Sequence, residues 1–95
     1  MHHHHNNVTL DGGYANRFCL LSLTGQPPFV VALSASLMVD GGEIEPFNNC
    51  GADVNFTSTS TLLSPSNSTV LPDRGGVMVK YSATDSAFLL LGGLL

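Results

Sequence analysis

The chain has 95 residues, of which 43% are hydrophobic and only 11% are charged, and seven acidic against three basic side chains give a net charge of −4. Three scattered cations exclude a nucleic-acid-binding surface and a polybasic membrane anchor, since both need clustered positive charge. The length predicts one small domain, and the absence of any run of 18 or more apolar residues excludes a membrane-spanning helix.

The chain begins with the histidine run His2 to His5 and has no histidine after it. We interpret residues 1–7 as a His/Asn-rich arm or the remnant of a purification tag, and residues 8–95 as a single β domain. Acid–base and metal chemistry near neutral pH depends mainly on histidine or on clustered charge. No glycine-rich phosphate motif and no Gly-x-Ser-x-Gly motif is present. The sequence therefore predicts a protein that is not an enzyme and that has no catalytic residue, no cofactor, no metal site and no small-molecule substrate.

Short apolar runs separated by Gly, Pro, Asn and Asp predict strands throughout the domain. The run Phe18–Leu23 is apolar on both faces, which predicts a central strand covered on both sides. The segment Phe29–Val39 alternates with a period of two, which predicts a long strand, although a helix over 32–38 is the alternative because Ala, Leu and Met favour helices. Further strands are expected over Ala52–Phe56 and Thr57–Leu63, the second of them exposed or at a sheet edge.

The acidic pair Glu43 and Glu45 lies two residues apart, so on a strand both side chains would point the same way. Paired carboxylates can transfer protons or bind Ca²⁺ with help from Asp40 and Asp53. A solvated acidic segment that protects a sheet edge explains the pair equally simply, and we favour that interpretation.

The cysteines Cys19 and Cys50 are the only two in the chain. In an oxidising compartment they could form a disulfide, and closing a loop of that length would stabilise the fold by roughly 3.5 kcal/mol. The alternative is a pair of buried thiols that act as small hydrophobic side chains. Their spacing fits neither a redox motif nor a zinc site.

The last segments predict a terminal hairpin, with alternating residues over 77–83 followed by a strand over 87–91. The C-terminus is unusually apolar for a chain end. It either completes the domain's own sheet or packs on a neighbouring subunit. The candidate interface residues are Phe88, Leu89, Leu90, Leu91, Leu94 and Leu95.

Regular turns between short strands predict an all-β fold, namely a small antiparallel β-sandwich of about seven strands, with a small β-barrel as the alternative. The charge-poor composition suits subunit contacts, whose centres are depleted in charge. No signal-peptide pattern follows Met1, so we expect cytoplasmic synthesis combined with a surface typical of extracellular β-proteins. That combination favours a structural, homo-oligomeric virion protein, such as a capsid decoration, coat or tail component, whose partners are its own copies or other virion proteins. The alternative is an extracellular adhesion or ligand-binding module.

Overall fold

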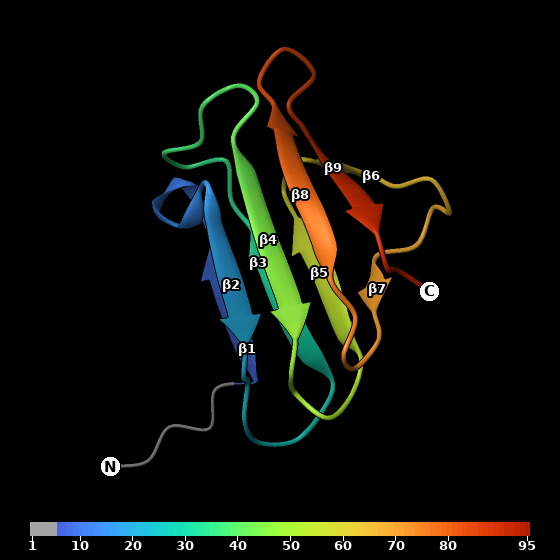
Figure 1. Ribbon diagram of the computed structural model, residues 1–95. Coiled ribbons are helices and arrows are strands. Elements are labelled where there is room, and N and C mark those ends of the chain that lie inside the picture. Colours follow the sequence, from blue (N-terminus) through green and yellow to red (C-terminus); the bar gives the residue numbers. More distant parts are fainter. Residues whose placement is uncertain (1–5) are drawn as a thin grey trace.

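The computed structural model describes residues 6–95 and consists of two β-sheets packed face to face (Figure 1). We call them sheet A, with the strand order β1-β3-β5-β7, and sheet B, with the order β2-β4-β8-β9-β6. The strands of sheet A are β1 (Asn7–Leu10), β3 (Phe29–Leu33), β5 (Val54–Ser58) and β7 (Val70–Leu71). The strands of sheet B are β2 (Arg17–Leu21), β4 (Glu43–Asn48), β6 (Thr61–Leu63), β8 (Val77–Ser82) and β9 (Ala87–Gly92).

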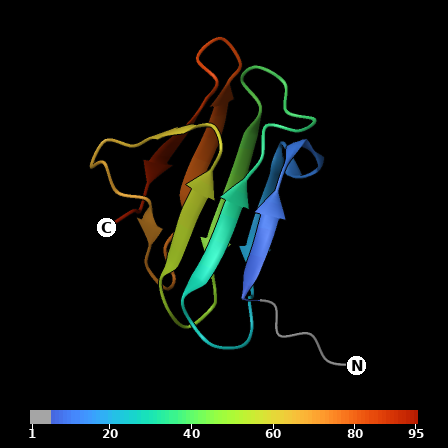
Figure 2. The same ribbon diagram turned by 180° about the vertical axis from the view of Figure 1, so that it is seen from behind.

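Consecutive strands alternate between the two sheets, so the first part of the chain winds as a coil. Each of the pairs β1–β2, β3–β4 and β5–β6 places one strand in sheet A and the next in sheet B. Stacked strands are parallel, with Asn7 opposite Val30 and Val30 opposite Asn55. Figure 2 shows β1, β3 and β5 side by side and running in the same direction. The architecture is a β-solenoid of about three turns.

The predicted antiparallel sandwich, and the barrel named as its alternative, are therefore wrong, although the all-β class is correct. The prediction rested on the regular turn signals between short strands, which do not specify whether the chain stays in one sheet or crosses to the other. The turn at 11–13 instead forms η1 (Gly12–Tyr14), a 3-10 helix that carries the chain to the other sheet. The Asp11 carboxylate accepts the Gly13 N–H at 2.8 Å and caps this turn. A Cβ atom on Gly12 would collide with the Leu37 carbonyl, so the approach of the next loop requires glycine there.

The terminal hairpin was predicted correctly, and its position makes sheet B a mixed sheet. Strands β8 and β9 are antiparallel, with Tyr81 opposite Phe88. The hairpin occupies the place between β4 and β6 in sheet B, where a regular solenoid would pair those two strands directly. In sheet A, β7 runs antiparallel to β5. The solenoid therefore ends in an antiparallel segment.

Three predicted strands differ from the structure. The one expected over Thr57–Leu63 divides between the end of β5 and β6, and β6 does lie at a sheet edge as predicted. The strand expected over Phe29–Val39 ends at Leu33, because the Ser34 hydroxyl accepts the Ser36 N–H at 3.2 Å and turns the chain. Leu37, which the alternation placed on the buried face, is 77% exposed. The strand predicted to be central over Phe18–Leu23 is β2, which lies at the edge of sheet B.

The hydrophobic core fills the space between the sheets. Its fully buried side chains come from both sheets and include Val31, Leu33, Ile44, Val54, Phe56, Leu71, Val79, Phe88 and Leu90. Burying one such side chain contributes about 1.5–3 kcal/mol. Since β9 pairs with both β8 and β6, the apolar C-terminal segment completes the domain's own sheet, which is one of the two alternatives that the sequence left open.

The buried side chain of Asn48 joins three segments at one end of the core. It is fully buried, and its amide nitrogen donates to the carbonyls of Ala52 (2.8 Å) and Leu71 (2.9 Å). Its amide oxygen accepts the N–H of Cys50 at 2.9 Å. Every polar atom of this side chain is thus satisfied, and the end of β4 is fixed to the following loop and to β7.

We predict that Asn48→Ala lowers the free energy of unfolding by about 3 kcal/mol, because the substitution leaves the partners of a buried amide without hydrogen bonds. Urea unfolding followed by circular dichroism measures the loss. The matched control is Asn49→Ala, since Asn49 is exposed and makes one long bond, 3.4 Å, to the Arg74 guanidinium. Equal stabilities of the two variants would contradict the role given to Asn48.

Candidate interaction surface

The outward side of sheet B carries a continuous set of apolar side chains. Because successive residues of a strand point to opposite sides, burial of Ile44, Val79 and Leu90 directs their neighbours outward. We define the sheet-B face as the outward side chains Phe18, Leu20, Phe47, Leu63, Met78, Leu89 and Leu91. The exposed fractions are 67% for Phe18, 55% for Leu20, 50% for Leu63 and 41% for Leu91.

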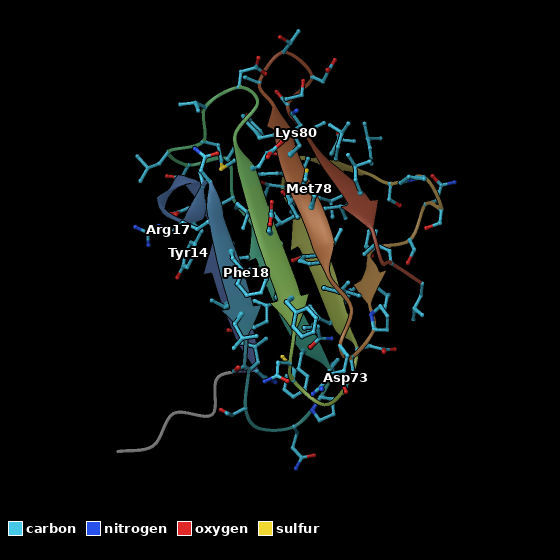
Figure 3. The ribbon with its side chains drawn as sticks, viewed as in Figure 1. Tyr14, Arg17, Phe18, Asp73, Met78 and Lys80 are labelled. Carbon is cyan, nitrogen blue, oxygen red and sulfur yellow. The ribbon has the colours of Figure 1, made fainter. Side chains whose placement is uncertain are left out.

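Aromatic rings form one half of this face. The rings of Phe18 and Phe47 lie 6.5 Å apart between centroids at an angle of 34°, and the strand register sets Leu20 beside Phe47. A shallow groove of about 270 Å³ runs from Phe18 across β4 and β8 to Leu91. Figure 3 shows Phe18 and Met78 on the side of sheet B that faces the viewer. The groove floor is a sheet surface, so its shape is fixed by the strands and not by a loop.

Aliphatic side chains form the other half of the face. Leu91 lies opposite Met78 on the neighbouring strand, and Leu89 lies opposite Leu63. A second shallow depression of about 150 Å³ lies among Leu63, Pro65, Leu89 and Leu91. The apolar surface therefore extends across all five strands of sheet B.

Charged groups on this face are few. Glu43 and Glu45 lie on β4 and point outward, as the two-residue spacing predicted. Lys80 pairs with Glu43 at 3.4 Å; the Lys80 side chain is exposed and that of Glu43 is partly exposed, so the pair stabilises little. Asp40, which the calcium hypothesis placed with Glu43 and Glu45, is engaged elsewhere. Its carboxylate accepts the Ala83 N–H at 3.0 Å. In the part of the chain that the structure describes, no three His, Cys, Asp or Glu residues are placed to hold a metal ion.

The outward side of sheet A has a different character. Its rows combine Thr9, Ala32 and Thr57 with Asn7, Val30 and Asn55 across β1, β3 and β5. These side chains are small or polar and uncharged. Of the two outward faces, sheet B therefore carries the large exposed apolar side chains. Other exposed apolar residues, namely Tyr14, Leu37, Val39 and Leu95, lie outside both faces.

The two cysteines occupy different environments. Cys19 lies on β2 and packs against the edge of the core. Cys50 follows β4; its thiol donates to the Leu21 carbonyl at 3.4 Å and accepts the Leu23 N–H at 3.3 Å. Both are free thiols in the structure. A disulfide between them in an oxidising solution stays a prediction.

The C-terminal residues proposed as an interface divide into two groups. Phe88 and Leu90 are fully buried in the core, whereas Leu89 and Leu91 point outward and belong to the sheet-B face. Leu94 is half-buried against the core, and Leu95 is exposed. The sequence analysis did not identify the remaining members of the face, namely Phe18, Leu20, Phe47, Leu63 and Met78. An alternating pattern over 43–48 was present but was interpreted only as an acidic segment.

The histidine run lies outside the described residues. Within residues 6–95 there is no helix of the length and hydrophobicity needed to cross a membrane. Comparison of the chain with protein-family models, with curated proteins and with solved structures finds no match.

Burial raises the pKa of the Cys19 thiol. The folded state therefore holds this proton more tightly than the unfolded state, whose thiol has a pKa of about 8.5. The resulting stability is fully present below that value and is lost as pH rises toward the folded pKa.

We predict that the free energy of unfolding falls more steeply above about pH 8.5 for Cys50→Ser than for Cys19→Ala/Cys50→Ser, measured by urea unfolding under reducing conditions. The two variants share every other titrating group, so Tyr and Lys ionisation cancels in the comparison. Parallel pH profiles would show that the Cys19 thiol has no perturbed pKa.

Proposed function

We propose that this protein is a structural, non-enzymatic subunit of a larger homo-oligomeric assembly, most naturally a virion protein such as a capsid decoration, coat or tail component. The single observation that carries the proposal is the sheet-B face. Isolated exposed apolar side chains are normal on soluble proteins, but a contiguous apolar surface marks a site of association.

The physical properties of the face suit contact between large, flat surfaces. Strands fix its shape, so little conformational entropy is lost when it is covered. Glu43 pairs with Lys80 where β4 begins, whereas Glu45 lies beside Phe18 and lines the groove. Phe18, Phe47 and Met78 also line the groove, and aromatic residues and Met are enriched in protein interfaces.

An extracellular adhesion or ligand-binding module is the second candidate. The observation in its favour is the groove between Phe18 and Leu91, which has the volume of a small site and is lined mainly by apolar side chains together with Glu45. Its width across open strands favours an extended apolar segment over an enclosed small molecule. A module of this kind would be a monomer before it meets its ligand, which separates the two candidates.

We predict that the purified protein forms species larger than a dimer in multi-angle light scattering at micromolar concentration, and that Leu63→Asn/Leu91→Asn lowers this mass. Both leucines are exposed on strands away from β2, so their replacement removes apolar surface without opening the core. The matched control is Thr9→Asn/Thr57→Asn on the outward side of sheet A. A monomeric wild-type protein would overturn the assembly, and an unchanged mass in the leucine variant would remove the sheet-B face as its cause.

A further inference from the structure

The solenoid is open at its first coil. Strands β1 and β2 each have one neighbour within residues 6–95, so both present an unpaired backbone edge on the same side of the molecule. None of residues 6–95 covers the core there. An opening of about 280 Å³ leads inward between the strands, and most of its lining is apolar: Val8, Leu10, Tyr14, Cys19, Leu20, Leu21 and Leu23, with Ser22. Repeat proteins normally cover such an end with a polar cap.

We call the open edges of β1 and β2 the first-coil edge, and it has few of the features that protect exposed strands. Natural sheet edges are blunted by short strands, proline, lysine, bulges or inward charges. Strands β1 and β2 have four and five residues, contain no proline, and carry one charge between them, on Arg17. An edge of this kind is a template for a further strand.

The opposite end of the solenoid differs. Its edge strands are β7 and β6, with two and three residues. The backbone of β7 is already engaged on its outer side, since the Leu95 N–H donates to the Val70 carbonyl at 2.9 Å. The two ends are therefore poorly matched, and head-to-tail stacking of copies into a fibre is disfavoured.

The free backbone groups of β2 can be assigned from its pairing with β4. The Leu21 carbonyl accepts the Asn49 N–H at 2.9 Å, so the backbone groups of Leu21 point toward β4. Backbone groups of successive strand residues point to alternate sides. Those of Phe18 and Leu20 consequently point outward, away from sheet B, and are free to pair.

We infer that the first-coil edge binds the same edge of a second copy, with β2 antiparallel to β2 of that copy about a two-fold axis at Cys19. The inference rests on the proposed function, because it names the partner and one of the contacts of the assembly. Pairing of all five residues of β2 requires the axis at its central residue, Cys19. Phe18 then lies opposite Leu20 of the second copy, and their outward N–H and C=O groups exchange hydrogen bonds.

A second copy suits this edge because the edge is complementary to itself. Each copy contributes an apolar opening that the other covers, and a two-fold contact presents the same surface on both sides. Arg17 lies at the end of β2, so the antiparallel arrangement separates the two cations by most of the strand. The sheet-B face continues across the joint, where Phe18 and Leu20 form aromatic–aliphatic pairs between strands.

The first test uses the thiol at the proposed axis. In the Cys50→Ser background, Cys19 is the only thiol, and a non-hydrogen-bonded antiparallel pair brings two Cα atoms to about 4.5 Å, within the range of a disulfide. Diamide takes two electrons and two protons from the two thiols and leaves a disulfide between the copies. We expect a covalent dimer on a non-reducing gel at micromolar protein, and its absence would overturn the inference.

The second test removes the outward N–H group alone. Leu20→Pro deletes a donor that makes no bond within the molecule, and proline is tolerated on an edge strand with that orientation. Two symmetric hydrogen bonds are lost, so we expect association and cross-linking to weaken about thirtyfold. The control Leu20→Ala shortens the same side chain but keeps the N–H. Circular dichroism and urea unfolding of Leu20→Pro establish that the fold is retained.

The outcomes separate this inference from the proposed function. Leu63→Asn/Leu91→Asn in the Cys50→Ser background should still cross-link through Cys19, because its first-coil edge is intact. A wild-type assembly that gives no Cys19 cross-link, or one that Leu20→Pro and Leu20→Ala weaken equally, overturns the edge contact and leaves the assembly standing. A monomer without cross-linking, as expected if another segment covers the opening, overturns both.

Discussion

Parallel pairing between successive coils is the constraint on which the rest of this structure depends. Strands β1, β3 and β5 can lie parallel in sheet A because the chain crosses to sheet B between them. The crossing places inward side chains of both sheets in one continuous core. It also creates two ends at which backbone and core would be open, a problem that a closed barrel does not have. The position of each exposed surface depends on which strands cover the first and the last coil of the solenoid.

The last coil solves this problem within the chain. The hairpin β8–β9 enters sheet B between β4 and β6, and β7 turns back along β5. Asn48 fixes the loop before β5 and the strand β7 to the end of β4, through hydrogen bonds to the backbone of Cys50, Ala52 and Leu71. The first coil has no equivalent within the described residues. The last coil thus ends in short edge strands, one of which already has a backbone hydrogen bond on its outer side. The first coil ends in longer edge strands beside an apolar opening.

The sequence predicted the local elements better than their arrangement. Alternation identified the inward residues Phe29, Val31 and Leu33 correctly, and the Gly-bounded pattern identified the terminal hairpin. Pairing direction could not be predicted, because a turn such as 11–13 can reverse a strand within a sheet or carry it to another, and the choice depends on the close approach of the Leu37 carbonyl to Gly12. The prediction that β2 is a central, covered strand was wrong for the same reason. Whether an apolar strand lies at the centre or at the edge of a sheet depends on which strands pair with it.

The candidate surface shows a related limit. Leu89 and Leu91 were named as candidate interface residues because they belong to a conspicuous apolar run, and the structure of β9 separates them from the buried Phe88 and Leu90. Phe18 and Phe47 are far apart in the sequence, and only the parallel register of β2 on β4 brings their rings together.

The two contacts also act in different directions. Pairing through the first-coil edge extends both sheets in their own plane and closes after two copies. Contact through the sheet-B face joins molecules along the normal to that plane. Neither contact alone builds an assembly larger than a few copies with a defined shape, whereas a two-fold edge contact presents two apolar faces in fixed relation. A small solenoid with one uncovered end and one apolar face thereby has the geometry of a building unit.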